Sequence, residues 1–381
     1  MKKLCFVATI PAVVHAFLRE HIQTAAKNYQ VTVICNTSEQ HLLEGLNARL
    51  ILLPIERKPS PLRDLWIMLT LLKLFRREQF DIVHSIMPKT GLLAMFSAYI
   101  ARVPIRIHTF TGQVWATKKG VPRILLKWLD KLIVHFAVCI LADSPSQRDF
   151  LLQEKVLSQG KIKVIGAGSI CGVNPLRFHP DIALRQRVRQ ELGIAQDARL
   201  ILFVGRLNRD KGVIDLAAAF NMLAKQYLNV ELLLVGAEEA IHFSDLQKIC
   251  SAFRARLHYV SFTATPEYYM AAADIFCLPS YREGFGLTII EAAACGVPAV
   301  ASRIYGITDA VEDGLTGILF PAGDVDLLTE ALSRLLADKE ILQLMGKAAQ
   351  TRVLALFSSE NISHELLMLY DQLVLEQPLL A

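Results

Sequence analysis

Glu283 and Glu291 are two glutamates with seven residues between them, and their types and spacing suggest chemistry. The apolar run 275–280 before them predicts a strand, and the alanine-rich run 292–296 after them predicts a helix. We therefore expect Glu283 on a loop that leaves a sheet and Glu291 on the next helix. Glycines let the backbone approach a ligand closely, and the first amides of a helix bind anions. These features suit a nucleotide diphosphate and its ribose.

Arg206 and Lys211 form a second element of this kind, in a turn between a predicted strand and a predicted helix. When a sugar nucleotide reacts, it leaves as a diphosphate, so negative charge grows on the leaving oxygen. Fixed cations aimed at that oxygen lower the barrier. Arginine offers a planar fork of donors and lysine a point charge. The alternative is that both are surface cations without a role.

The two elements together resemble the signature of retaining glycosyltransferases of family 4, which have the GT-B fold. The matching upstream stretch runs from 203 to 212. The resemblance implies that Arg206 and Lys211 clamp the donor diphosphate, that Glu291 binds the ribose hydroxyls, and that Glu283 lies near the donor sugar, positioning its hydroxyls or stabilising positive charge. It also implies a substrate-binding surface made by the backbone of Gly205, Gly284, Phe285, Gly286, Leu287 and Thr288.

His108 is the candidate catalytic residue of the first half, because it ends a predicted strand and the family carries a histidine in a matching position near the donor sugar. A lone histidine is more often structural. Phe262, after the predicted strand 257–260, is expected near the base. One departure from the family is the stretch 9–11, Thr-Ile-Pro, where many members have paired glycines. This places the donor's contact with that loop in doubt.

Asp324 and Asp326 fit a D-x-D metal pattern, but an apolar helical run follows them. We expect Asp324 to cap that helix and Asp326 to lie in its first turn, so we predict no metal site and no cofactor. The seven cysteines are odd in number and form no C-x-x-C pair. We expect buried thiols in a reducing cytoplasm.

The chain of 381 residues is too long for one ordinary core. Continuous apolar strands alternate with helices in both halves, which predicts parallel sheets covered on both faces. We expect a GT-B architecture of two Rossmann-like, doubly wound domains facing a central cleft that holds the active site. The first, residues 1–170, would bind the acceptor, and the second, residues 183–358, the nucleotide sugar. The C-terminal helix of residues 359–381 would pack back on the first domain.

The charge is unevenly distributed along the chain. Residues 1–165 carry 23 basic and 11 acidic side chains, a net +12, whereas residues 166–381 carry 18 and 25, a net −7. The stretch 113–131 interleaves cations with tryptophan and aliphatic residues, as interfacial helices do, although an ordinary amphipathic helix would also fit. We expect peripheral contact with an anionic membrane and no spanning segment. No nucleic-acid motif accompanies the basic stretch, so we predict no nucleic-acid partner.

The sequence 108–115 with 118–120 looks like bacterial enzymes that extend polyprenyl-diphosphate-linked glycans. We therefore expect a sugar, an N-acetylhexosamine from a UDP-sugar rather than a GDP-sugar, to be added to a lipid-linked saccharide of O-antigen, lipopolysaccharide, capsule or protein-linked glycan. The enzyme would be cytoplasmic, on the inner face of the membrane. The alternatives are transfer to a soluble acceptor, a UDP-sugar 2-epimerase, and a non-enzymatic sugar-nucleotide sensor.

Overall fold

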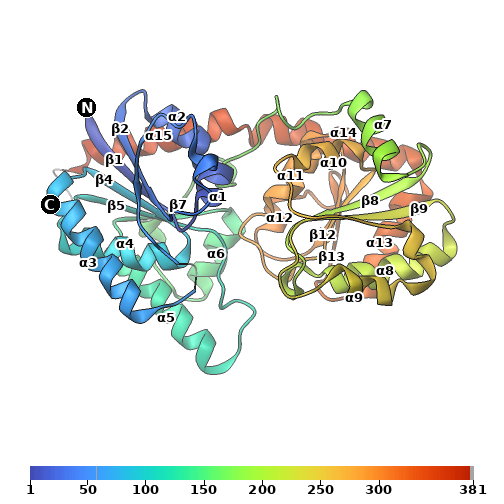
Figure 1. The fold of residues 1–381 in the computed structure, drawn as a ribbon, viewed down its shortest axis with the longest axis horizontal. Coiled ribbons are helices and arrows are strands. Elements are labelled where there is room, and N and C mark those ends of the chain that lie inside the picture. Colours follow the sequence, from blue (N-terminus) through green and yellow to red (C-terminus); the bar gives the residue numbers. More distant parts are fainter. Residues whose placement is uncertain (57, 378–381) are drawn as a thin grey trace. The chain divides into compact units, whose positions relative to one another are not determined.

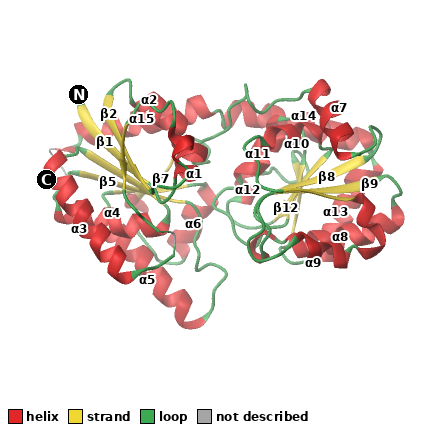
Figure 2. Cartoon of the chain, in the orientation of Figure 1, coloured by secondary structure: helices red, strands yellow, loops and turns green. Residues whose placement is uncertain are grey.

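A computed structural model describes residues 1–56 and 58–377. The chain forms two compact units. Unit 1 contains residues 1–171 and the chain from Ser359 onward, and unit 2 contains Gly172–Ser358. Each unit is a parallel sheet covered by helices (Figures 1 and 2), so the predicted α/β fold class is confirmed. No helix among the described residues is long and apolar enough to cross a membrane.

Unit 1 is built on a seven-stranded parallel sheet in the order β3-β2-β1-β4-β5-β6-β7. Its apolar strands are buried because helices cover both faces. The strands are β1 (Lys2–Val7), β2 (Tyr29–Cys35), β3 (Arg49–Leu52), β4 (Ile82–Ile86), β5 (Ile105–Phe110), β6 (Cys139–Ala142) and β7 (Ile162–Val164).

One face of this sheet packs against α3 (Pro61–Glu78), α4 (Pro88–Ile100), α5 (Gly120–Phe136) and α6 (Pro145–Gln153). The other face packs against the segment after β1 and against α15 (Ser359–Leu375). The sequence predicts one helix over 13–28, but the structure breaks it into α1 (Pro11–Val13), a π turn η1 (Val14–Leu18) and α2 (Arg19–Ala25). Short 3-10 turns η2 (Gln40–Leu43) and η3 (Gln159–Lys161) complete the unit.

The C-terminal helix α15 packs beside α2 in unit 1 (Figure 1) and is fastened there by buried hydrogen bonds. His21 Nδ1 lies 2.8 Å from Ser363 Oγ, and His84 Nδ1 lies 2.6 Å from the Tyr370 hydroxyl. His84 Nε2 lies 2.7 Å from Thr109 Oγ1. His21 Nε2 lies 2.6 Å from the carbonyl oxygen of Ile170, so all four ring nitrogens have a partner, as buried groups require.

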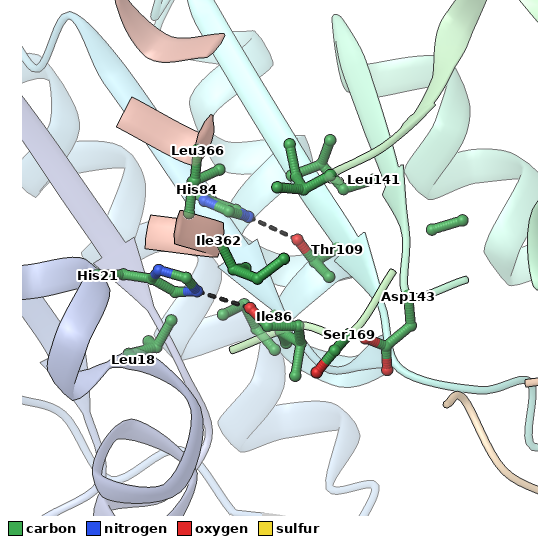
Figure 3. A pocket seen from close by; sticks show the side chains of 13 residues that line it. Leu18, His21, His84, Ile86, Thr109, Leu141, Asp143, Ser169, Ile362 and Leu366 are labelled. Atoms are coloured by element: carbon green, nitrogen blue, oxygen red, sulfur yellow. Dashed lines mark hydrogen bonds between the residues drawn. The ribbon is translucent and has the colours of Figure 1, made fainter. Parts of the chain in front are cut away.

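A cavity of about 20 Å³ lies between His21 and His84, at the carboxyl ends of β4, β5 and β6 (Figure 3). Ser169 and Asp143 also line it. This volume holds about one water molecule. The cavity is therefore too small for a sugar in this conformation.

Unit 2 is built on a six-stranded parallel sheet in the order β10-β9-β8-β11-β12-β13. The strands are β8 (Arg199–Val204), β9 (Val230–Val235), β10 (Leu257–Val260), β11 (Ile275–Leu278), β12 (Ala299–Ser302) and β13 (Gly317–Phe320). The helices are α7 (Ile182–Leu192), η4 (Arg209–Lys211), α8 (Val213–Gln226), α9 (Phe243–Ile249), η5 (Ser251–Arg256), α10 (Pro266–Ala272), α11 (Leu287–Ala294), α12 (Ile307–Ala310), α13 (Val325–Ala337) and α14 (Lys339–Leu356).

The two sheets share one topology, and in each the strand order reverses beside the first strand. The reversal falls between β1 and β4 in unit 1 and between β8 and β11 in unit 2. In open parallel sheets, ligands bind outside the carboxyl ends of the strands at this switch point. The loops after β8 and β11 are therefore where a ligand of unit 2 is expected.

The seven cysteines are free and buried, as predicted. Burial also affects three histidines of unit 1. It lowers the pKa of His21 to about 4, lowers the pKa of His84 well below its usual value, and lowers that of His108 to about 3. The folded chain therefore holds these rings neutral.

We predict that unit 1 loses stability as the pH falls from 7 to 5. An unfolded histidine takes up a proton near pH 6.5, whereas these three folded rings do so only well below that, so stability is present above 6.5 and is lost toward 4. The loss is about 2 kcal/mol per histidine at pH 5. Urea unfolding at pH 7 and 5 measures it, and His21→Gln should reduce the slope. Equal stability at both pH values would contradict the prediction.

Candidate functional site

Two loops at the switch point of unit 2 contact each other through hydrogen bonds and an ion pair. The first, residues 205–212, follows β8, and the second, residues 279–286, follows β11. The backbone amide of Tyr281 donates to the carbonyl oxygen of Asp210 at 2.8 Å, and the Asp210 carboxylate pairs with Arg282 at 3.0 Å. The Tyr281 hydroxyl donates to Asp215 at 2.6 Å. The loops therefore behave as one braced element.

Gly212 allows the two loops to meet. Its φ of +68° is left-handed, and a Cβ there would collide with the carbonyl oxygen of Pro279. Only glycine satisfies both conditions without strain. The first loop is further shaped by Asn208, whose side chain accepts a hydrogen bond from the amide of Lys211 at 3.0 Å.

Lys211 and Glu283 meet across the braced loops. The Lys211 ammonium lies 2.5 Å from Glu283 Oε1, and the Ser280 hydroxyl donates to the same oxygen at 2.8 Å. Both side chains are mostly buried but keep some exposure. The structure thus brings together two of the residues that the sequence singles out. An accessible ammonium held in one position is suited to an incoming anion.

Arg206 lies on the same loop and is paired with a carboxylate that no sequence motif indicates. Its Nη1 lies 2.5 Å from Glu239, on the loop after β9, and Asn208 Nδ2 donates to Glu239 at 2.6 Å. Arg206 is about two-fifths exposed. Gly205, just before it, continues the strand pairing through its amide, which donates to Val235. Each cation of the candidate clamp therefore has a carboxylate partner in the described chain.

Helix α11 begins between the two glutamates. Gly286, with φ +83°, precedes its first residue, Leu287, and the first amides of a helix have no partner within it. The Phe285 side chain is buried and makes an edge contact with Phe357 at 5.2 Å between ring centres. Phe285 can therefore offer a ligand only its backbone. Gly284 and Thr288 lie in the same turn.

Glu291 lies on α11, and burial raises the pKa of its carboxyl to about 8. Arg177 acts in the opposite direction on this pKa and Glu267 in the same one. No hydrogen bond or ion pair joins the Glu291 carboxyl to another residue in the described part of the chain. A half-buried carboxyl without partners is suited to accept hydroxyl donors from a ligand.

Arg177, whose charge lowers the pKa of Glu291, contacts the loop that follows β10 and the helix α10. Its guanidinium donates to the carbonyl oxygen of Ala264 at 2.6 Å and pairs with Glu267 at 2.8 Å. Phe262 lies on the same loop, and its ring is 70% exposed. An exposed aromatic ring offers a stacking surface to a flat base.

His108 is the predicted catalytic residue that the structure does not place at an accessible position. It is fully buried in unit 1, where its Nδ1 lies 2.9 Å from Ser85 Oγ and its ring packs under Gly91. Direct contact between this ring and a donor sugar, which the sequence suggests, does not occur in this conformation because backbone and side chains cover it. Its Nε2 has no hydrogen-bond partner among the described residues.

Asp324 caps α13 as predicted, because its carboxylate accepts a hydrogen bond from the amide of Leu327 at 2.9 Å, and Asp326 lies in the first turn. No group of three or more potential metal ligands occurs among the residues described. The site offers the cations Lys211 and Arg206 and the first amides of α11 to an anion.

Sequence patterns do not identify four residues of the site, Glu239, Ser280, Asp210 and Arg177. These residues act through contacts between loops that are distant in the chain, and their types are common on surfaces. The one available signal was that Glu239 follows a predicted strand and Ser280 ends one. Arg177 lies between the two predicted domains, in residues 171–182, where no periodicity identifies a contact.

Comparison with known proteins relates both units to one enzyme class. Residues 14–168 match the family described as Glycosyltransferase Family 4, and residues 185–352 match that described as Glycosyl transferases group 1. The capsular polysaccharide biosynthesis glycosyltransferase CapM of Staphylococcus aureus is 29% identical over 92% of each chain. An Escherichia coli UDP-Gal:alpha-D-GlcNAc-diphosphoundecaprenol alpha-1,3-galactosyltransferase is 26% identical over 84% of this chain and 83% of its own.

The fold has solved counterparts. The Anabaena protein Alr3699/HepE, in complex with UDP and glucose, superposes with a TM-score of 0.83 over 98% of this chain and all of its own, at 19% identity. The predicted GT-B fold is confirmed by this likeness together with the two parallel sheets.

We predict that Gly212→Ala destabilises unit 2 more than Gly314→Ala does. Both glycines have positive φ, but a Cβ at Gly314 meets open space, whereas one at Gly212 meets Pro279. The strain alone costs about 1 kcal/mol, and the collision should bring the loss at Gly212 to roughly 3 kcal/mol or more. Chemical unfolding of both variants tests this. Equal losses would show that the two loops do not need this close approach.

Proposed function

Because the chain belongs to the family 4 glycosyltransferases and has their GT-B fold, we propose that it moves a sugar from a nucleoside diphosphate to an acceptor hydroxyl with retention of configuration. The observation that carries this proposal is the Lys211–Glu283 pair, fixed across two braced loops at the switch point of unit 2. It joins a cation for the diphosphate to a carboxylate for the sugar.

In the proposed reaction, Lys211 and Arg206 stabilise the negative charge that grows on the departing diphosphate. The first amides of α11, from Leu287 and Thr288, add donors to its oxygens. Glu283 positions the sugar hydroxyls or stabilises positive charge on the ring. No residue is an evident covalent nucleophile, so we favour attack from the face on which the diphosphate leaves, with a phosphate oxygen taking the acceptor's proton.

The nucleoside is proposed to bind with its ribose on Glu291 and its base near Phe262. We favour UDP over GDP. The support is that the Anabaena structural neighbour was solved with UDP, and also with UDP-glucose, and that the Escherichia coli relative is named for a UDP-sugar. His108 is proposed to act as a positioning residue that fixes Ser85 and the first turn of α4, since it is buried.

The acceptor is proposed to be a polyprenyl-diphosphate-linked saccharide bound by unit 1, and the sugar an N-acetylhexosamine. The relatives support this direction, because one is named for capsule synthesis and another for a diphosphoundecaprenol acceptor. The product would be a bacterial surface glycan such as capsule, O-antigen or lipopolysaccharide. The enzyme would work from the cytoplasm as a peripheral protein on the inner face of the membrane.

The test is a matrix of radiolabelled UDP- and GDP-sugars against polyprenyl-diphosphate saccharides and their water-soluble counterparts. Transfer from a UDP-N-acetylhexosamine to the lipid-linked acceptor supports the proposal if NMR shows that the sugar keeps the anomeric configuration it has in the donor. UDP release without any added acceptor would favour a 2-epimerase. Transfer to the soluble saccharide alone would favour a soluble acceptor.

We predict that Lys211→Ala and Arg206→Ala each lower kcat by about 100- to 1,000-fold, as the loss of one group that stabilises transition-state charge does. Arg209→Ala is the matched control, since Arg209 is an exposed cation on the same turn, and it should leave kcat within about twofold. Steady-state kinetics with circular dichroism to verify folding would measure this. Loss of activity in the control alone would place the diphosphate elsewhere.

We predict that donor affinity rises with pH up to about 8. The free enzyme holds Glu291 protonated below that pH, because burial raises its pKa to about 8, whereas two ribose hydroxyls donate best to the ionised form. Binding therefore releases a proton, and KM for the donor falls between pH 6 and 8. In Glu291→Gln the KM should be higher and independent of pH. If the donor KM of this variant still falls between pH 6 and 8, Glu291 is not the group that causes the pH dependence.

A further inference from the structure

Two helices of unit 1 carry the same pattern of exposed apolar side chains on their outward faces. In both, the exposed residues follow the spacing i, i+3, i+4 and i+7, which places them in one stripe along one face of the helix. The residues are Leu62, Leu65, Trp66 and Leu69 on α3, and Val121, Ile124, Leu125 and Trp128 on α5. Leu62 is 85% exposed, Trp66 53% and Trp128 55%.

These stripes are not the core-facing sides of the helices. α3 packs on its sheet through Ile67, Leu71 and Phe75, and α5 does so through Ile133 and Val134, all of which are buried. A helix that covers a sheet normally turns a polar face to solvent. On α8, which covers the sheet of unit 2, the large apolar side chains that are exposed are Ile214 and Met222, at 38% and 37%.

The two stripes lie at the same edge of unit 1. α3, α4 and α5 each lead into the next strand of a parallel sheet, so all three run opposite to the strands and begin at the sheet's carboxyl edge. They lie side by side, with α4 in contact with both neighbours (Figure 1). Each stripe starts at the second residue of its helix. Both stripes therefore flank the edge at which parallel sheets bind ligands.

The charges around the stripes are of one sign. The three carboxylates of the two helices are already engaged: Asp64 with Lys89, Glu78 with Arg49, and buried Asp130 with the Trp115 indole. The cations that are exposed and make no ion pair with another described residue are Lys73 and Arg76 on α3, Lys131 on α5, and Lys118 and Lys119 before it. Arg123 and Lys127 instead pair with Glu154 at 2.7 Å.

We propose that the eight stripe residues form a docking surface, the α3/α5 surface, for an anionic lipid bilayer. Leucine, isoleucine and valine would enter the acyl boundary, Trp66 and Trp128 would lie at headgroup depth, and the exposed cations would meet lipid phosphates. The proposal rests on the proposed function in one respect, that a lipid-linked acceptor would reach the sheet edge from this bilayer.

A second copy of the chain fits this surface less well. In a symmetric pair the same patch would face itself, and its cations would meet cations with no free carboxylate opposite. An anionic bilayer supplies both the apolar layer and the opposite charge. Charge complementarity therefore selects the membrane over self-association.

Intrinsic fluorescence offers a direct test, because the chain has three tryptophans and Trp115 is buried. We expect phosphatidylglycerol vesicles with brominated lipid to quench Trp66 and Trp128, so that Trp66→Phe and Trp128→Phe each remove part of the quenching and the pair removes nearly all of it. Quenching should weaken with salt. Emission that the vesicles leave unchanged would overturn the proposal.

Vesicle co-sedimentation of charged variants gives the second test. Trp66→Glu and Trp128→Glu should each lower the partition coefficient by roughly tenfold or more, and Lys118→Gln or Lys119→Gln by roughly fivefold. Leu344→Glu, an equally exposed leucine on α14 of unit 2, is the matched control and should bind as wild type. If the tryptophan variants bind vesicles normally but alter the oligomeric state in light scattering, the surface is a protein interface and the proposal is wrong.

Activity with two acceptors separates this proposal from the proposed function. The tryptophan variants should lose transfer to an acceptor embedded in phosphatidylglycerol vesicles while keeping transfer to a short-chain acceptor in solution. Wild-type protein that binds vesicles but transfers to neither acceptor would contradict the proposed function alone. Variants that keep full transfer in vesicles would contradict the docking surface alone.

Discussion

The structure of unit 2 depends on one constraint, that the loops after β8 and β11 must approach closely enough for Lys211 to reach Glu283. Gly212 against Pro279, and Asp210 against Tyr281 and Arg282, hold that approach. A partly buried ion pair adds little net stability, since desolvation offsets the attraction. The role of the Lys211–Glu283 pair is to hold the ammonium in a fixed position. The ammonium is already ordered before an anion arrives, so less side-chain freedom is lost on binding.

Much of the fold could be predicted because its strands and amphipathic helices have clear periodicity. The sequence predicts helices over 61–78 and 266–272, and the structure forms both with these bounds. The helix Ile182–Leu192 was missed because it is rich in arginine and glutamine and buries little besides Val188 and Arg189. The helices α12 and α14 were missed too. The break after β1 could not be foreseen, because a π turn leaves the composition of a helix unchanged.

The candidate site could be predicted where it consists of short motifs and not where it depends on packing. The spacing around Arg206, Lys211, Glu283 and Glu291 identified the side chains, and the structure brings Lys211 and Glu283 into contact. Partners from distant loops, such as Glu239 on Arg206, have no local signal. Burial is equally invisible in sequence. His108 was expected to end a strand, but β5 continues to Phe110, and the ring lies beneath Gly91 instead of at a surface.

A crystal structure of the protein with UDP would test the central claim most directly. We expect the Lys211 ammonium within about 3 Å of a phosphate oxygen, the usual length of a charge-assisted hydrogen bond, with Glu283 still beside it and the ribose on Glu291. A nucleotide bound elsewhere, with the Lys211–Glu283 pair unchanged and no phosphate near it, would contradict the account.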